Sequence, residues 1–291
     1  MTLAVGAGEL AAARAEGRAV VGFSIYNLEQ GIGVGRAAAA ARTPVLLQAG
    51  SSAFRYAGRE PLAQLALALA QASAAPIGVH LDHATELAEI EACLRAGYSS
   101  VMFDGSALPL EENVRRTRAV ARAAHAAGAW VEAELAGIAG DEDESSGAQA
   151  GALTDPEVAA RFVAETGVDA LAVAVGNVHG IPREPVVLDL ERLAAIARLV
   201  EAPLVLHGAS GLPDDDVRDA IALGVAKLNV NTELRRAFRG ALLATAAQPP
   251  EGDSLPALLA GVVDATEAAA REKLRAFGLA PATAGGGASR P

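Results

Sequence analysis

Short runs of β-forming residues alternate with longer helical stretches along most of this chain, and this alternation restricts the possible folds more than any other feature. Eight runs have the length and composition of buried strands, and they cover residues 19–27, 44–50, 77–83, 98–105, 129–135, 170–176, 203–208 and 225–232. Between them lie helical stretches such as 86–97, 111–128, 190–200 and 215–224. Eight strands, each followed by a helix, predict an α/β fold in which a parallel sheet closes into a (β/α)₈ barrel. A doubly wound open sheet is the competing arrangement.

The chain shows no composition boundary that would divide it into separate units. Residues 1–278 are therefore expected to form a single barrel domain, with extra C-terminal helices at 232–247 and 254–277, and residues 279–291 are expected to form a disordered tail. Hydrophobic residues make up 52% of the sequence, which is enough for a sizeable core. The stretch "TDPE" at 154–157 fits a capping box in which Thr154 and Glu157 begin a helix.

Charge and cysteine content exclude several classes of protein. The net charge of −11 argues against nucleic acid or an anionic membrane as the main partner, although a small anionic substrate can still bind at a locally positive site. The single cysteine, Cys93, excludes a disulfide framework and a thiolate metal site. The sequence has neither the pattern of a signal peptide nor an apolar run long enough to span a membrane. A soluble cytoplasmic protein is expected.

Polar side chains collect at the carboxyl ends of the predicted strands, where a (β/α)₈ barrel places its chemistry. Six consecutive strands, the third to the eighth, carry them: Asp82 and His83, then Asp104, then Glu132 and Glu134, then Asn177 and His179, then His207 and Ser210, and finally Asn229, Asn231 and Thr232. Because these ends meet at one rim of a barrel, the side chains are expected to share a single site.

Three of the five histidines, His83, His179 and His207, lie at such strand ends. Three imidazoles with an open fourth position are the ligand set of a catalytic zinc site, and they would also accept cobalt, iron or manganese. The alternative is that each is an ordinary hydrogen-bonded histidine. His80 faces the opposite side of its strand from His83 and is expected to serve packing, while His125 lies in a helix and is expected to be solvated.

Two loops at this rim suggest further functions. The segment 136–151, with four consecutive acids at 141–144, is long for this architecture and has the composition of either a mobile lid or a plain solvated loop. The stretch "GASG" at 208–211 precedes a helix and lies after the seventh strand, a usual phosphate position in this fold. The glycine-rich "GIGVGR" at 31–36 is a poor match to a dinucleotide-binding motif because it ends in Arg36.

Taken together, these stretches resemble the class II, zinc-dependent ketose-bisphosphate aldolases, which include the fructose- and tagatose-bisphosphate aldolases. The resemblance runs from about residue 10 to residue 240 and is carried by "HLDHA", "GYSSVMFDGSALPLEENVRRT", "VEAEL", "LAVAVGNVHG", "LVLHGASGLP" and "KLNVNTELR", in this order. It implies a barrel enzyme that cleaves or forms a phosphorylated ketose, with dihydroxyacetone phosphate and an aldehyde as the other partners.

The resemblance also implies a role for each site residue. His83, His179 and His207 would hold the zinc ion, with Asp104 and Glu134 offering it an alternative, inward position. Asp82 would move the proton of the C4 hydroxyl, Glu142 would exchange a proton with the carbon of a zinc-stabilised enediolate, and Asn229 would contact that enediolate. The implied phosphate site, which often holds a monovalent cation, comprises Gly180, Gly208, Ala209, Ser210, Asn231 and Thr232.

Several positions depart from the family's usual residues, including Ser24 on the first strand and Gly50 after the second. These departures leave the substrate open among fructose bisphosphate, tagatose bisphosphate and another phosphorylated keto-sugar, such as a deoxy-keto-gluconate phosphate. The alternatives from other functional classes are a metal-dependent hydrolase and a non-catalytic partner subunit. The phosphate-site motifs argue against the hydrolase, and the presence of Asp82 and all three histidines argues against the non-catalytic subunit. The resemblance further suggests a homodimer or homotetramer.

Overall fold

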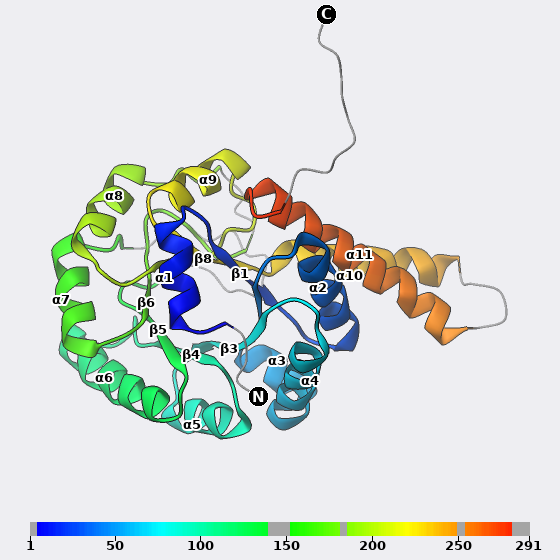
Figure 1. Ribbon diagram of the computed structural model, residues 1–291, viewed down its shortest axis with the longest axis horizontal. Coiled ribbons are helices and arrows are strands. Elements are labelled where there is room, and N and C mark those ends of the chain that lie inside the picture. The colour runs from blue at the N-terminus through cyan, green and yellow to red at the C-terminus, as the bar shows by residue number, and fades with distance from the viewer. Residues whose placement is uncertain (1–4, 139–151, 181–184, 249–253, 281–291) are drawn as a thin grey trace, which may run out of the picture.

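The computed structural model describes residues 5–138, 152–180, 185–248 and 254–280, and these form a closed barrel of parallel strands surrounded by helices (Figure 1). The strands, paired in chain order, are β1 (Val20–Ser24), β2 (Val45–Ala49), β3 (Ile77–Ala84), β4 (Ser100–Asp104), β5 (Trp130–Glu134), β6 (Ala170–Ala172), β7 (Leu204–Leu206) and β8 (Val225–Val230). Val21 of β1 pairs with Val45 of β2 on one side and with Leu228 of β8 on the other. This closure confirms the predicted (β/α)₈ barrel and excludes the open doubly wound sheet.

One helix precedes the first strand, and the others follow the strands and cover the outside of the barrel (Figure 1). They are α1 (Ala7–Ala15), α2 (Leu28–Ala41), α3 (Ser51–Ala57), α4 (Arg59–Ala72), α5 (Leu87–Ala96), α6 (Leu110–Ala126), α7 (Pro156–Thr166), α8 (Leu190–Leu199), α9 (Asp214–Ala222), α10 (Thr232–Ala247) and α11 (Leu255–Ala276). No helix in the described ranges is both long enough and apolar enough to cross a membrane.

The barrel interior has an apolar end and a polar end. At the amino end of the strands, Val20, Leu46 and Trp130 are buried in one cluster with Leu10 of α1. The indole of Trp130 also donates to the carbonyl of Val5, at 3.2 Å, which ties the N-terminal segment to the barrel floor. Towards the other end the buried interior residues become polar, so the site-forming side chains rest on a closed apolar base.

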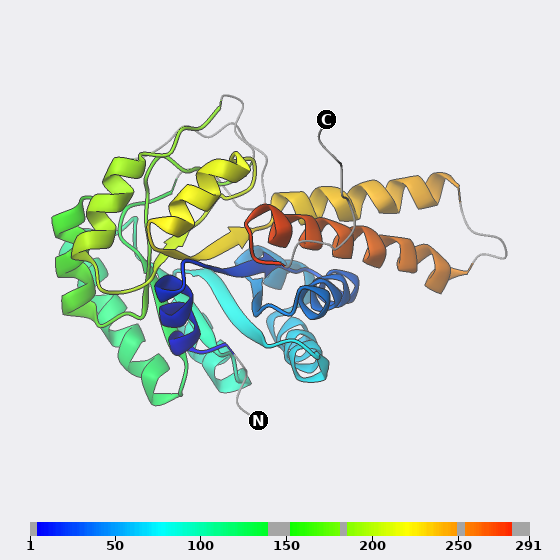
Figure 2. The ribbon, with the colours of Figure 1, turned by 45° about the horizontal axis from the view of Figure 1, so that its top comes forward.

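The two C-terminal helices, α10 and α11, pack against each other and project beyond the ring of helices (Figure 2). Helix α11 also packs closely on α2. A Cβ atom at Gly33 would lie 2.8 Å from Cβ of Thr266 and 2.9 Å from the backbone nitrogen of Glu267, and one at Gly31 would lie 2.3 Å from Leu69. The glycines of "GIGVGR" therefore permit close helix packing, as expected for a stretch that is not a nucleotide-binding loop.

The capping box predicted at 154–157 is wrong in its first residue. The N-cap of α7 is Asp155, whose side chain accepts from the backbone N–H groups of Glu157 and Val158, both at 2.9 Å. Thr154 instead accepts from the N–H of Ala174 through its hydroxyl, also at 2.9 Å. The side chain of Thr154 therefore makes a long-range hydrogen bond to the chain after β6 and does not cap α7, as local sequence predicted.

Candidate metal centre and active site

Strand β3 delivers His83 to the rim through an irregular backbone. Strict alternation would place His83 on the opposite face from Asp82. The pairing of β3 with β4 shifts its register between Leu81 and Ala84, and His83 has a φ of 48°, in the left-handed region. Such a conformation costs a non-glycine residue about 1–3 kcal/mol and is found preferentially at functional sites. As a result Asp82 and His83, neighbours in sequence, both line the same cavity.

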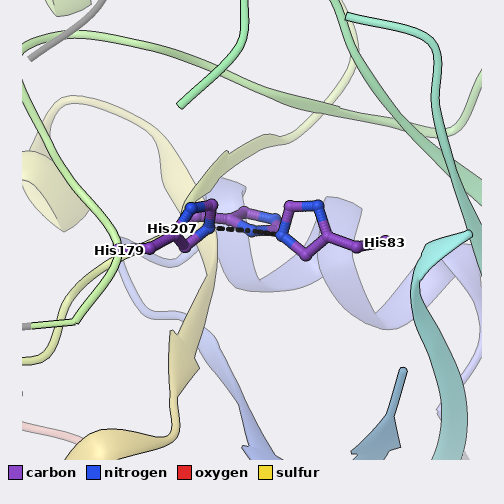
Figure 3. Close-up of side chains that lie close together, drawn as sticks. All are labelled: His83, His179 and His207. Atoms are coloured by element: carbon purple, nitrogen blue, oxygen red, sulfur yellow. Dashed lines mark hydrogen bonds between the residues drawn. The ribbon is translucent and has the colours of Figure 1, made fainter. Parts of the chain in front are cut away.

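The rings of His83, His179 and His207 converge, as Figure 3 shows. His83 Nε2 lies 2.9 Å from His207 Nδ1, and His179 Nε2 lies 3.4 Å from the same atom. Two nitrogens bound to one tetrahedral zinc at 2.0–2.1 Å would be about 3.3–3.4 Å apart. One separation matches this value and the other is a few tenths of an ångström shorter, so small ring rotations would bring the set to a metal. The three imidazoles that the sequence singled out therefore form a group suited to a divalent ion.

The protonation of the three histidines differs because their surroundings differ. Burial lowers the pKa of His179 to about 4 and that of His207 well below its ordinary value, with the charge of His83 adding to both effects. Burial would also lower the pKa of His83, but the neighbouring carboxylates of Asp82, Asp104 and Glu134 outweigh it and raise the pKa to about 10. A metal ion binding at neutral pH must accordingly displace a proton from His83.

His207 is oriented by a buried carboxylate. Its Nε2 donates to Glu132 Oε1 at 2.7 Å, while the other carboxylate oxygen, Oε2, lies 2.8 Å from Nζ of Lys227. All three side chains are fully buried. Because Nε2 carries the proton shared with Glu132, the lone pair of His207 is on Nδ1, the atom that faces His83 and His179. A carboxylate that holds the far nitrogen of a ligand histidine is a recurrent feature of metal sites.

Asp82 is fixed by two amides, one from the adjacent strand β2 and one from β8 across the barrel. Its Oδ2 accepts from Gln48 of β2 at 3.0 Å, and its Oδ1 accepts from Asn229 of β8 at 3.1 Å. Lys227 donates to the oxygen of Asn229 at 2.7 Å, which leaves the amide nitrogen facing Asp82. The carboxylate of Asp82 is thus held between β2 and β8, beside His83 and within the same cavity.

Asp104 and Glu134 form a second group with His83 that is also suited to a metal ion. Asp104 Oδ2 lies 3.0 Å from His83 Nδ1, and Glu134 Oε2 lies 4.0 Å from the same nitrogen. Burial raises the pKa of Glu134 to about 8. Burial acts in the same direction on Asp104, but hydrogen bonds from His83 and Ser106 outweigh it and hold the pKa of that carboxyl well below its usual range. Both residues lie at the rim, as predicted. They face Nδ1 of His83, whereas His207 faces Nε2 of the same ring.

The cavity at this rim has a volume of about 380 Å³ and is lined by Asp82, His83, Asp104, Glu134, His179 and Asn231, among others. The remaining residues predicted to bind phosphate lie at the neighbouring ends of β6, β7 and β8. Gly208 has a φ of 63°, and a Cβ there would come within 2.0 Å of the carbonyl of Val178, so only glycine fits. Ala209, Ser210, Asn229 and Thr232 are buried, and Gly180 has a φ of 78°.

The helix after "GASG", α9, adds little positive charge for an anion at 208–211, and the phosphate site predicted there stays a prediction. Helix α9 begins with Asp214, Asp215 and Asp216, so its positive end is already balanced by three carboxylates. The N-terminus of α10, with Asn231 as N-cap and Thr232 as first residue, is the alternative at this rim. Asn231 is positioned by its amide nitrogen, which donates to the hydroxyl of Tyr26 at 3.1 Å.

Comparison with known proteins gives the family. A family model described as "Fructose-bisphosphate aldolase class-II" matches residues 7–281, nearly the whole chain. The chain belongs to the class II fructose-bisphosphate aldolase family.

Solved structures of this aldolase family are similar along most of their length. The YdjI aldolase from Escherichia coli K12 has a TM-score of 0.84 and 34% sequence identity, covering 94% of this chain and 96% of that one. A putative fructose-1,6-bisphosphate aldolase from Coccidioides immitis has a TM-score of 0.81, 35% identity and the same coverage, 94% and 96%. Fructose-bisphosphate aldolase from Campylobacter jejuni, at 22% identity and a TM-score of 0.80 over 95% of this chain and 96% of that one, shares the fold.

Some members of this aldolase's site were not anticipated from sequence. Gln48 and Lys227 were not named as site residues, although a glutamine and a lysine within otherwise apolar strands, "VLLQA" and "VAKLNV", were a usable signal. Glu142 and the rest of the predicted lid from residue 139 to residue 151 lie outside the described residues.

His80 takes the packing role expected of it, whereas His125, expected to be only solvated, is paired with a carboxylate. His80 is buried deeper in the barrel, where it stacks on Trp130 with ring centroids 5.3 Å apart and lies 2.8 Å from Ser100 Oγ. The half-exposed His125 lies 2.7 Å from Asp169 Oδ2 on the outside of the protein.

Proposed function

We propose that this chain catalyses the reversible aldol cleavage of a phosphorylated ketose into dihydroxyacetone phosphate and an aldehyde. The observation that supports this most directly is the placement of Asp82, held by amides from β2 and β8, beside the convergent histidine triad in one cavity. Membership of the class II aldolase family sets the reaction type. It argues against the metal-dependent hydrolase and the non-catalytic subunit that the sequence left open.

His83, His179 and His207 fit a zinc ion, and cobalt, iron or manganese would suit the same three imidazoles. When bound there, a divalent ion acts as a Lewis acid on the ketose carbonyl. The proposed task of Asp82 is to take the proton of the C4 hydroxyl as the bond between C3 and C4 breaks. Gln48 and Asn229 keep its two oxygens fixed, so little reorganisation is needed at the moment of transfer.

A second acid must deliver a proton to C3 of the product half, and we assign this role to Glu142. It follows β5 in the chain, on the predicted lid. Replacement by alanine is expected to slow hydrogen exchange at that carbon in dihydroxyacetone phosphate while zinc stays bound. Unchanged exchange in Glu142→Ala would move the role to Asp141 or Asp143.

The phosphate of the ketone half is proposed to bind at the ends of β6, β7 and β8, at Gly180, Gly208, Ala209, Ser210, Asn231 and Thr232, with a monovalent cation beside it. The left-handed backbone of Gly208, with a φ of 63°, supports this, because a turn that contains such a residue can direct successive backbone N–H groups towards an anion. Asn229 would contact the oxygens of the same half. Asp104 and Glu134 would give the metal ion its alternative position.

Fructose 1,6-bisphosphate, tagatose 1,6-bisphosphate and a deoxy-keto-gluconate phosphate are the candidate substrates, and a homodimer or homotetramer is the proposed assembly. The test is release of triose phosphate from each bisphosphate by the zinc-loaded protein, with and without a chelator. Cleavage that the chelator abolishes and zinc restores is the expected result. Cleavage that persists in the chelator, after zinc has been shown to be absent, would refute the metal-dependent mechanism.

A further inference from the structure

Helix α11, one of the two C-terminal helices outside the barrel, ends beside α9 and the start of α10 (Figures 1 and 2). Lys273, in its last turn, has its Nζ 3.0 Å from Glu233 Oε1 of α10 and 3.9 Å from Asp214 Oδ1 at the start of α9. The same ammonium group lies 5.5 Å from the ring centre of Phe277. Lys273 therefore joins three helices at the rim where the proposed site lies.

Glu233 connects this lysine to the loop 208–211, whose residues are proposed to bind phosphate. The backbone N–H of Gly211 donates to Glu233 Oε1 at 3.3 Å, and this is the same oxygen that faces Lys273. Glu233 directly follows Thr232, whose hydroxyl is buried and makes no hydrogen bond within the described part of the chain. One side chain thus ties the loop after β7 to the residues after β8, the two main parts of the proposed phosphate site.

Carboxylates border this loop, and they would repel a phosphate group unless cations balance them. Besides Glu233, they are Asp214, Asp215 and Asp216 at the start of α9. The side chains of Lys273 and Glu233 are only 15% and 20% exposed, so water screens their charges incompletely. Because Lys273 neutralises it, the carboxylate of Glu233 can hold the loop while adding little negative charge beside an anion.

We propose that Glu233 and Lys273 are positioning residues for the phosphate-binding loop. Glu233 fixes the loop through the N–H of Gly211, and Lys273 holds and neutralises Glu233. Neither side chain touches the substrate; both keep the backbone N–H groups of the loop in the orientation that an anion needs. This inference rests on the proposed aldolase function, and it gives α11 a part in substrate binding although the helix lies outside the barrel.

The experiment measures the dissociation constant of dihydroxyacetone phosphate for the zinc-loaded protein by isothermal titration calorimetry, without an aldehyde. Aldol synthesis with glyceraldehyde 3-phosphate then gives kcat and the KM for each substrate. The variants are Glu233→Ala, Glu233→Gln, Lys273→Met and the double variant Glu233→Gln/Lys273→Met. Arg271→Met is the matched control, because Arg271 is a cation two residues from Lys273 whose partner, Glu267, lies on the same helix at 3.3 Å.

Glu233→Ala should weaken binding roughly tenfold, because the loop loses a hydrogen bond to a charged acceptor. Glu233→Gln should stay within about twofold of the wild type, since its amide oxygen can still accept from Gly211. Lys273→Met should weaken binding roughly threefold, because it leaves an unbalanced carboxylate beside the loop, and the double variant should recover most of that loss. Arg271→Met should bind as the wild type does.

In aldol synthesis, the effects should appear in the KM for dihydroxyacetone phosphate. The KM for glyceraldehyde 3-phosphate, the kcat and the zinc content should stay at the wild-type values, because only the binding of one phosphate is altered. A general loss of structure would change all of these quantities together.

Three results would overturn the inference. Wild-type affinity in Glu233→Ala would show that the loop does not depend on this carboxylate. Equal weakening in Glu233→Gln and Glu233→Ala would show that the bond to Gly211 is not the cause. A double variant that binds no better than Lys273→Met would show that Lys273 does not act through Glu233.

Failure of the proposed function would be distinguishable, because the dissociation constants are measured without turnover. If none of the three candidate substrates were cleaved while the expected pattern of dissociation constants held, the aldolase activity would be refuted and the positioning role would stand. A wild-type protein that does not bind dihydroxyacetone phosphate would overturn both.

Discussion

Replacing Lys227 by methionine should destabilise this protein strongly, because it leaves a buried carboxylate without its cation. Lys227 Nζ lies 2.8 Å from Glu132 Oε2, and both side chains are fully buried. Methionine fills a similar volume, so packing is largely kept while the charge is removed. The substitution thus removes the ion pair, together with the 2.7 Å hydrogen bond from Lys227 to Asn229 Oδ1.

Removing one partner of a buried ion pair costs about 3–5 kcal/mol of unfolding free energy, and complete burial means that solvent screening does not reduce this value. Glu132 would keep its hydrogen bond from His207, at 2.7 Å, so we expect the lower end of the range, about 3 kcal/mol. For a chain of 291 residues the unfolding entropy is about 0.6 kcal/mol/K, and the melting temperature should fall by about 5 °C.

The assay is thermal and urea unfolding of the chelator-treated protein, which separates folding from metal binding. Glu132→Gln should cost a similar amount, and the double variant Glu132→Gln/Lys227→Met should recover most of the loss, since neither buried charge remains. Lys273→Met is the control: Lys273 pairs with Glu233 at 3.0 Å but is partly exposed, so the loss should be about 1 kcal/mol or less. Single losses below about 1 kcal/mol, or losses that simply add in the double variant, would refute the reasoning.

Three further predictions follow from the site and the core. Zinc content after dialysis should fall in His179→Ala, and full stoichiometry by elemental analysis would contradict its role as a ligand. The pKa of His83 is raised to about 10, so its charged form stabilises the metal-free protein fully below the unfolded pKa of about 6.5, and this contribution is lost as the pH rises towards 10. The free energy of unfolding in urea should therefore fall less between pH 7 and pH 10 in His83→Asn than in the wild type. An equal fall in both proteins would contradict the assignment. Cys93, the single cysteine, is fully buried and burial raises its pKa to about 12, so a thiol reagent should label it readily only after unfolding, and rapid labelling of the native protein would contradict its burial.

Much of the fold was readable because its signals are local and repeated. Each predicted strand corresponds to an observed one, and the errors are in length. The sixth strand was expected to run to residue 176 but ends at Ala172, because the chain turns where the side chain of Asn177 accepts from the N–H of Val175 at 2.8 Å. Thr154 was misassigned as a cap for a similar reason. In both cases a polar side chain satisfies a backbone group that periodicity alone would assign to regular structure.

The histidine triad was also predictable, but its geometry was not. Strand ends at 83, 179 and 207 share a rim in any barrel of this topology, so the sequence could bring the three residues together. It could not show that His83, on the wrong face of its strand by alternation, reaches the site through a register shift and a positive φ. That conformation is strained locally and persists because the surrounding structure requires it.

The sequence by itself therefore determined the element order, the barrel, and which polar residues stand at its functional rim, because periodicity and strand ends are properties of neighbouring residues. Only the tertiary structure decided how those residues are held. Glu132 meets Lys227 and His207, and Asp82 meets Gln48 and Asn229, across strands that are far apart in the chain. These contacts depend on barrel closure and on the register between strands, which are set by the packing of the whole molecule and are not encoded in any short stretch.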